Sequence, residues 1–184
     1  ELDRAHRQFA DAMATFPSDL PHFLPWAAAR QCRDGLARHG LLERDLLQPV
    51  ATAFDAVDAQ LAALPGDAFR PGHGDGHPGN ILATARGWPW CDFEDVSMMP
   101  PFWDLAAACG WTWLYAWHPE VTEELVRLQG GATDADAWCL AQGARAVYAG
   151  VVGAVMALQG FPSQEFVDRQ LVGIAERLRA LGWV

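Results

Sequence analysis

The sequence contains no lysine, so its 13 basic side chains are all arginines. It has 23 acidic side chains, which gives a formal net charge of -10 at pH 7. A nucleic-acid partner normally requires a basic patch, so this balance argues against one. The same balance is compatible with a cationic small substrate or a bound Mg²⁺, and equally with an acidic surface that only keeps the protein in solution.

The sequence also lacks a Cys-x-x-Cys spacing, a secretory leader and a long apolar run. Its 4 cysteines are scattered, so we expect neither a zinc site nor a disulfide framework, and reduced thiols are the default. No charged segment followed by an apolar one opens the chain, and the apolar run 146–158 is too short to span a bilayer. We therefore expect a cytoplasmic protein that binds no membrane.

Apolar residues, in contrast, are abundant. They make up 51% of 184 residues, enough for a sizeable core in one domain or in one large lobe of something bigger. Apolar spacing and helix-breaking residues predict a mostly helical chain. The expected helices cover residues 2–16, 24–38, 43–64, 102–116, 119–130, 133–158, with Thr133 as N-cap, and a last one after Ser163.

The segment 43–64 has the cleanest helical periodicity. Its apolar positions alternate in steps of three and four, while its aspartates fall off that stripe. Such a stripe suits either a coiled-coil seam or a helix buried against its own domain, and the small residues between the apolar ones favour the second. Two short strands, 80–85 and 88–93, are expected to form a hairpin around Gly87.

Three polar residues in the middle of the chain have a spacing suited to phosphoryl transfer. Asp75 follows His73 by two residues, Asn80 follows Asp75 by five, and Asp92 comes after a short apolar run. An aspartate can orient an attacking hydroxyl and accept its proton, while an asparagine and a second aspartate can hold Mg²⁺ against phosphate oxygens. The expected hairpin would bring Asn80 and Asp92 together on one cation.

Three separated motifs carry a family resemblance. They are His-Gly-Asp-x-His-Pro-Gly-Asn-Ile-Leu at 73–82, Asp-Phe-Glu-Asp at 92–95 and Phe-Trp-Asp-Leu-Ala at 102–106. In order and spacing this set resembles the aminoglycoside phosphotransferase and choline kinase-like family, whose members have the protein-kinase fold. The close match covers 69–113. The resemblance implies an α+β, mostly α chain that forms the C-terminal lobe of such a kinase, with a small hairpin at the active-site cleft.

The same resemblance implies roles for five residues. Asp75 would be the catalytic aspartate, and Asn80 and Asp92 would be the Mg²⁺ ligands. His73 would brace the loop, and Asp104 would tie the following helix to it. The implied reaction transfers the γ-phosphate of ATP or GTP to a hydroxyl of a small molecule, such as an aminoglycoside, a choline-like compound or a sugar.

Three further residues keep two interpretations each. His77 either stiffens the loop together with Pro78 or faces the substrate. Glu94 and Asp95 are either second-sphere contacts of metal or substrate, or solvated turn residues.

Gly74 stands where protein kinases usually carry an arginine that pairs with a phosphorylated activation loop, so the resemblance favours a small-molecule kinase without that switch.

Three other functions deserve comparison with a kinase. The glycines at 74, 76 and 79 fit a dinucleotide-binding pattern, but that fingerprint needs a helix opening at the third glycine. The series His73, Asp75 and His77 could ligate a transition metal, as in a metallophosphoesterase. A kinase lobe could also persist as a non-catalytic binding or assembly module, although such a module has no need for three converging polar groups.

One part of the family pattern is missing. Family members carry an N-terminal lobe with a glycine-rich loop and a strand lysine over the phosphates, whereas no glycine-rich hairpin precedes residue 69 and no lysine exists here. We therefore divide the chain into a helical segment 1–64, a catalytic and metal-binding core 69–113 and C-terminal helices 119–184. The nucleotide-clamping lobe is absent, so the chain alone should bind nucleotide weakly and transfer no phosphate.

Overall fold

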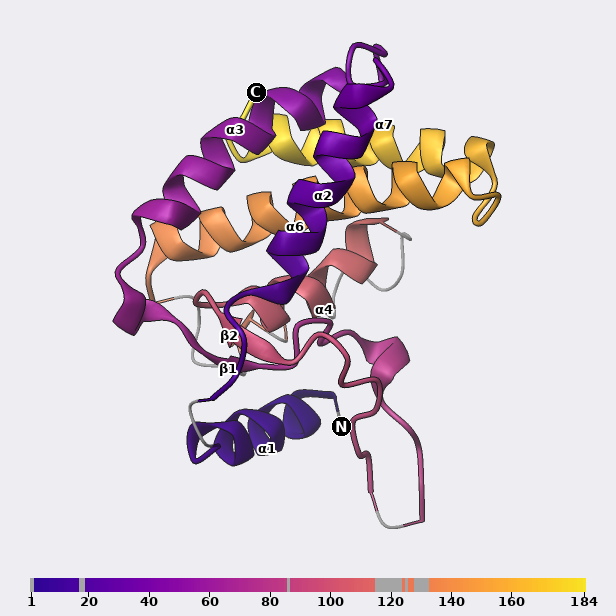
Figure 1. The fold of residues 1–184 in the computed structure, drawn as a ribbon. Coiled ribbons are helices and arrows are strands. Elements are labelled where there is room, and N and C mark those ends of the chain that lie inside the picture. The colour runs from indigo at the N-terminus through magenta and orange to yellow at the C-terminus, as the bar shows by residue number, and fades with distance from the viewer. Residues whose placement is uncertain (1, 17–18, 86, 115–123, 125, 128–132) are drawn as a thin grey trace. The chain divides into compact units, whose positions relative to one another are not determined.

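The computed structural model describes residues 2–16, 19–85, 87–114, 124, 126–127 and 133–184 (Figure 1). Helices dominate this part of the chain. They are α1 (Leu2–Ala14), α2 (Leu24–Arg38), α3 (Gln48–Ala63), α4 (Trp103–Leu114), α6 (Ala135–Leu158) and α7 (Gln164–Ala180). Strands β1 (Arg70–Gly72) and β2 (Ser97–Met99) and the 3-10 helices η1 (Gly66–Ala68) and η2 (Pro78–Asn80) complete the described elements.

The chain forms two compact units. Unit 1 consists of Glu1–Leu24 and Pro65–Ala141, and unit 2 consists of Pro25–Leu64 and Gln142–Val184. The chain therefore leaves unit 1 after α1, builds α2 and α3 of unit 2, and returns to unit 1 for the motifs at 73–106. The three segments expected from the sequence do not follow this division, because 1–64 and 119–184 each contribute to both units.

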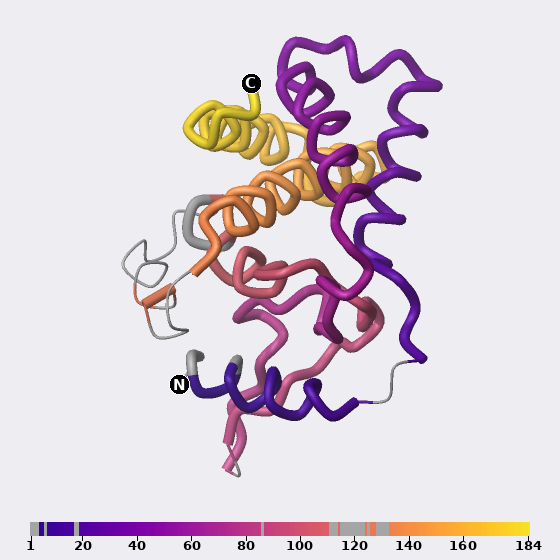
Figure 2. Tube along the Cα trace, turned by 90° about the vertical axis from the view of Figure 1, so that its left-hand side faces the viewer, coloured from indigo at the N-terminus to yellow at the C-terminus, as the bar shows by residue number. Residues whose placement is uncertain are grey.

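Unit 1 contains the sheet. Strand β1 pairs antiparallel with β2, with Arg70 opposite Met99 and Gly72 opposite Ser97. On the other side of β2, the Phe23 N–H donates to the Met98 carbonyl at 3.0 Å, which makes a short parallel bridge. Helix α1 packs against β1 and lies beside the loop that follows η2, as Figure 2 shows. The segment with the motifs thus starts at a strand that pairs with β2 and packs against α1.

The hairpin expected over 80–93 is only partly formed. The chain does turn back on itself around Gly87, but the two arms meet at isolated antiparallel bridges, Ile81 with Trp90 and Thr84 with Gly87, and not along two strands. Pro89 accepts the Leu82 N–H at 3.0 Å and, as a proline, cannot donate in return. The paired strands of unit 1 are β1 and β2 instead.

Unit 2 is built from the periodic helices. The apolar stripe of α3 is buried within the unit, against α7. Its buried members are Leu47, which precedes the helix, and Val50, Phe54, Val57 and Leu61 within it. The Trp26 ring stacks on Phe54 with 5.0 Å between centroids, and its Nε1 donates to Asp58 at 2.6 Å. The stripe therefore serves the core of its own unit and not a coiled-coil seam.

Several helix ends differ from the sequence-based expectation. Helix α3 begins at Gln48 rather than Glu43, because Pro49 occupies its first turn and residues 42–47 form turns. The N-cap of α6 is Asp134 and not Thr133, since the Asp134 carboxylate accepts the Ala137 N–H at 2.9 Å. The helix expected at 119–130 falls largely outside the described residues.

Helix α6 is long and apolar enough to cross a membrane, judged by length and composition alone, and no other described helix passes that test. Of its most apolar 18-residue window, however, 56% is buried inside the structure. Gly150 of α6 meets Val50 of α3 so closely that an added Cβ would lie 2.9 Å from a Val50 methyl carbon. A buried apolar helix with such a contact is typical of a protein core.

Candidate active site

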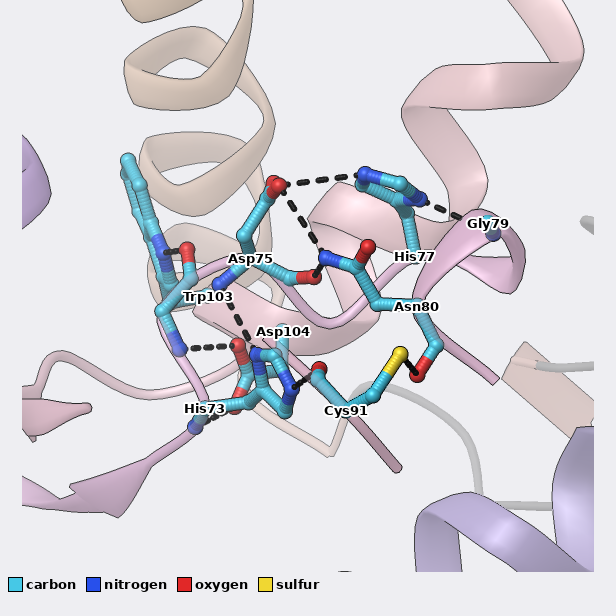
Figure 3. A network of polar contacts seen from close by, with 9 residues as sticks. His73, Asp75, His77, Gly79, Asn80, Cys91, Trp103 and Asp104 are labelled. Carbon is cyan, nitrogen blue, oxygen red and sulfur yellow. Dashed lines mark hydrogen bonds and ion pairs between the residues drawn. The ribbon is translucent and has the colours of Figure 1, made fainter. Parts of the chain in front are cut away.

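The loop that follows β1 is fixed by the first turn of α4. Asp104 accepts the His73 N–H through Oδ2 at 2.7 Å and the Gly74 N–H through Oδ1 at 2.9 Å. The Trp103 indole N–H donates to the Gly74 carbonyl at 2.6 Å. Hydrogen bonds to a charged group are each worth about 1.5–3 kcal/mol. Residues that are 29 to 31 positions apart in the chain are therefore held together by three bonds, which Figure 3 displays.

Two positions of this loop have no room for a side chain. Gly74 has φ +88°, and a Cβ there would collide with the Asp95 backbone. Gly76 lies against Asp104, whose Cβ would be 2.8 Å from an added Cβ. Glycine is needed at the first position for its conformation and at both positions for the close approach.

His73 connects this loop to the segment before Asp92. Its side chain is fully buried, and its Nδ1 accepts the Asp75 N–H at 3.4 Å. Since Nδ1 accepts, the proton resides on Nε2, which donates to the Cys91 carbonyl at 3.0 Å. The ring also packs against Phe9, with centroids 5.4 Å apart. Both nitrogens thus bind protein atoms.

Asp75 and Asn80 form one hydrogen-bonded unit. The Asn80 Nδ2 donates to the Asp75 carbonyl at 3.0 Å and to its carboxylate Oδ2 at 3.3 Å. The His77 Nε2 lies 3.0 Å from the same Oδ2, and in Figure 3 dashed lines join the carboxylate to both side chains. Asn80 is buried, whereas the Asp75 side chain is 32% exposed. Its carboxylate is therefore oriented by the loop and still reachable from outside.

Asp92 lies beside this unit along the backbone. The Cys91 N–H donates to the Asn80 carbonyl at 2.9 Å, and the Cys91 thiol donates to the same oxygen at 3.4 Å. Asp92 is exposed and has φ +64°, a left-handed conformation that is uncommon for a residue other than glycine and is concentrated at functional sites. Peptide pairing of residues 80 and 91 thus holds Asn80 close to Asp92.

These residues fit the oxygen-rich coordination of a Mg²⁺ ion. Within the described part of the chain, both hydrogen bonds of the Asn80 side chain are donated by Nδ2, which leaves Oδ1 to act as a ligand. The exposed Asp92 supplies a carboxylate. One amide oxygen and one carboxylate, with further positions for water and phosphate oxygens, are the donors that Mg²⁺ takes in phosphotransferases.

A transition-metal site made of His73, Asp75 and His77 does not fit. Both His73 nitrogens are used within the protein, and among the described residues no group of three or more His, Cys, Asp and Glu side chains could hold a metal. The dinucleotide pattern fails as well, because Gly79 lies inside the three-residue helix η2 and opens no α-helix.

The remaining expected site residues lie in different settings. Glu94 is exposed. Asp95 is half-buried, and its carbonyl accepts the Ser97 hydroxyl at 3.0 Å. Two contributors were not singled out from the sequence: Trp103, which holds the Gly74 carbonyl, and Cys91, whose peptide links the two halves of the site. Trp103 lies inside the third motif and Cys91 directly precedes the second, and these positions are the sequence signal that could have identified them.

Comparison with known proteins decides the family. The sequence profile of the phosphotransferase enzyme family matches residues 1–140. The chain belongs to this family. A search of the curated proteins finds no match to it. The family's name refers to phosphate transfer, and the residues 73–106 that form the network above lie within the matched range.

Solved structures of small-molecule kinases have the same fold. Choline kinase LicA from Streptococcus pneumoniae superposes with a TM-score of 0.69 at 16% identity, over 97% of this chain and 63% of that one. A choline/ethanolamine kinase family protein from Mesorhizobium loti gives 0.72 at 19% identity, over 99% and 65%. Spectinomycin phosphotransferase APH(9)-Ia, solved with ADP and spectinomycin, gives 0.66 at 14% identity, over 100% and 64%.

These likenesses confirm the predicted fold class, a mostly helical chain with a small antiparallel pair and a kinase-like phosphotransferase fold. The chain spans less than two thirds of the length of the three structures. Whatever the longer kinases do with their remaining third therefore lies outside these 184 residues.

Proposed function

We propose that this chain belongs to a small-molecule kinase that transfers the γ-phosphate of ATP or GTP to a substrate hydroxyl. Asp75 orients that hydroxyl and accepts its proton. Asn80 and Asp92 hold Mg²⁺ against the phosphate oxygens. His73 and Asp104 keep the loop in place, the first through Cys91 and the second through the loop amides.

The observation that carries this proposal is the bonded unit of Asp75 and Asn80 next to Asp92. Phosphoryl transfer depends mainly on positioning and on neutralising charge. A carboxylate that is oriented and reachable, at 32% exposure, suits the first task. The two oxygen ligands suit the second, since a bound Mg²⁺ neutralises charge on phosphate oxygens.

The charge near the loop supports a cationic substrate. Asp92, Glu94 and Asp95 follow one another within four positions, and the first two are exposed. A quaternary amine or a protonated amino sugar would be attracted to such a segment, and the two kinds of substrate named for the similar structures, choline and spectinomycin, are compounds to test first. We expect the KM of a cationic acceptor to rise with salt, because exposed charges are screened.

We further propose that the nucleotide is clamped from outside these residues, by an N-terminal lobe like that of the longer kinases. Without lysine, this chain offers no ammonium to the phosphates. It should then bind Mg-ATP weakly and transfer no phosphate by itself. All four cysteines are free thiols, a state that suits the cytoplasm, which we propose as the location.

The test uses two proteins: the 184-residue chain and a chain extended N-terminally from the source gene. Calorimetric titration with Mg-ATP and with Mg-GTP measures binding, and ADP or GDP release measures transfer to choline, spectinomycin or a neutral sugar. The decisive variant is Asp75→Asn, which keeps the shape of the side chain but removes its basicity. The matched control is Asp67→Asn, an exposed aspartate of the same unit.

We expect turnover in the extended chain only. Asp75→Asn should lower kcat by about 10²–10⁴-fold, the usual contribution of general base catalysis, while Asp67→Asn should stay within about two-fold. Removing Mg²⁺ with EDTA should abolish transfer. Equal turnover by the extended chain and its Asp75→Asn variant would refute the role of Asp75. Tight Mg-ATP binding by the 184-residue chain would refute the proposal that a second lobe clamps the nucleotide.

A further inference from the structure

Each ring nitrogen of His77 has a polar neighbour. Its Nδ1 accepts the Gly79 N–H at 3.0 Å, which caps the first turn of η2. Its Nε2 lies 3.0 Å from the Asp75 Oδ2. The side chain is only 15% exposed, about half the value of Asp75. A ring held at both nitrogens and largely covered cannot turn freely.

The cap at Gly79 decides which nitrogen carries the proton. A nitrogen that accepts an N–H must present its lone pair, so Nδ1 is unprotonated and Nε2 bears the hydrogen. The Nε2–H therefore donates to the Asp75 carboxylate. The direction of this bond follows from the backbone of η2 and requires no charge on the imidazole.

The Asp75 Oδ2 receives two donors, His77 Nε2 and Asn80 Nδ2 at 3.3 Å. The last torsion of an aspartate is broad and roughly two-fold, so a carboxylate that is one-third exposed has several orientations available. Two donors that converge on one oxygen select a single orientation. Both donors come from η2 and the residue before it, because His77 caps this helix and Asn80 ends it.

We propose that His77 is a positioning residue: its Nε2–H sets the orientation of the Asp75 carboxylate toward the substrate hydroxyl. This inference rests on the proposed kinase function and deepens it. It gives His77 a task apart from stiffening the loop with Pro78 and apart from touching the substrate. A small misplacement of a reacting group can lower a rate by about 10²-fold, so the effect belongs in kcat.

Two substitutions separate this role from loop stiffening. In asparagine, the amide oxygen is as many bonds from the backbone as the histidine Nδ1, so His77→Asn keeps an acceptor for the Gly79 N–H but has no donor that reaches Asp75. In glutamine, the amide nitrogen is as far out as Nε2, so His77→Gln keeps the donor to Asp75 and loses the cap. The pair thus removes one contact at a time.

Kinetics of the N-terminally extended chain, with Mg-ATP and choline or spectinomycin, form the first arm. We expect His77→Gln to keep kcat within about three-fold, and His77→Asn to lose about 10–100-fold in kcat with both KM values within about two-fold. The reverse order, with His77→Asn active and His77→Gln inactive, would mean that activity depends only on the cap at Gly79. A rise in the acceptor KM with unchanged kcat would mean that His77 touches the substrate.

The second arm requires no activity. In the ¹³C,¹⁵N-labelled 184-residue chain, the Asp75 carboxyl carbon shift should be the same in the unmodified chain and in His77→Gln, and different in His77→Asn. The His77 Nε2–H resonance should shift in Asp75→Ala and stay in place in the control Asp67→Ala. Equal Asp75 shifts in both His77 variants would overturn the inference. Shifts as expected in an extended chain without turnover would refute the kinase function alone.

Discussion

Unit 1 and unit 2 are each stabilised internally by a different kind of interaction. In unit 2, buried apolar side chains repeat along α3 and α7, and the contacts that matter join one helix stripe to another. In unit 1, the segment between η1 and α4, which contains the motifs, has little regular structure: two three-residue strands, the 3-10 helix η2 and loops. The loop after β1 is fixed by hydrogen bonds from side chains to backbone, with Asp104, Trp103 and His73 as the main partners.

The two kinds of interaction suit different roles, stability in unit 2 and the positioning of side chains in unit 1. Apolar packing tolerates small shifts, because dispersion contacts are many and weak. A hydrogen bond depends steeply on distance and angle, so a network of them fixes atoms more closely. The proposed catalytic group, Asp75, lies in the unit that has the polar network. We therefore expect substitutions in unit 2 to lower stability first, and substitutions in unit 1 to disturb the site first.

The largest loss of stability is expected in unit 2, from Phe54→Ala. Phe54 is buried, stacked on Trp26 and covered by the Arg33 guanidinium, 5.6 Å from its ring centre. Such truncations lower the free energy of unfolding by about 3–5 kcal/mol, measured by urea denaturation. The control is Thr52→Ala on the exposed side of α3. Shifts of the His73 and Gly74 amide resonances should be unchanged, and movement of either would contradict the separation of the two units.

The next largest loss is expected in unit 1, from Asp104→Ala. It removes both acceptors of the His73 and Gly74 amides. Two charge-assisted bonds at about 1.5–3 kcal/mol each set the upper range, and partial access of water reduces the loss, so we expect about 2–4 kcal/mol in the same denaturation experiment. Asp104→Asn, which keeps a single acceptor, should lose about half as much. Here the loop amide resonances should shift while those of α3 stay in place.

A smaller effect is expected for Trp103→Phe, which keeps an aromatic ring against Phe23 but removes the N–H that binds the Gly74 carbonyl. A buried carbonyl left without its donor costs about 1–3 kcal/mol. The replacement ring is smaller, which adds a packing loss. We expect about 2 kcal/mol by urea denaturation, together with a shift of the Gly74 carbonyl carbon resonance. A stability loss without any change at Gly74 would attribute the whole effect to packing.

The sequence predicted unit 2 better than unit 1 for a physical reason. The stripe of α3 and the buried face of α7 are periodic within one element, so they can be read locally. Pairing of β1 with β2 joins residues such as Gly72 and Ser97 that lie 25 positions apart, and no local signal marks that pairing. The family motifs located the candidate site residues, but neither the bond from Trp103 nor the link through Cys91 could be derived from spacing.

The expected strands at 80–93 illustrate how local propensity can mislead. Their composition suits strands, yet Asn80 closes η2 and Pro89 has no N–H to extend a ladder. Only isolated bridges remain. The Asn80 N–H donates to the His77 carbonyl within η2 at 3.0 Å, so Asn80 accepts a bond from the Cys91 N–H across the two arms but does not return one. Departures from local rules are expected at functional sites.

The smallest effects compare two helix caps, one in each unit. Asp134 and Ser163 begin α6 and α7, and each accepts an amide proton three residues on, at 2.9 Å and 3.3 Å. Loss of a cap costs about 0.5–2 kcal/mol, and a negative charge at a helix N-terminus adds about 0.3–1 kcal/mol. We therefore expect Asp134→Ala to destabilise by about 1–2 kcal/mol and Ser163→Ala by about 0.5–1 kcal/mol.

Salt and a third variant identify the cause of that difference. The excess loss in Asp134→Ala should shrink in 1 M NaCl, because the dipole term is screened there while the hydrogen bond is not. Thr133→Ala, at the position that the sequence suggested as the cap, should change the unfolding free energy by less than about 0.5 kcal/mol. Serine and threonine are good caps when their backbone precedes the helix directly, and that place is taken by Asp134. A larger loss of unfolding free energy in Thr133→Ala than in Asp134→Ala would mean that Thr133, as expected from the sequence, is the N-cap.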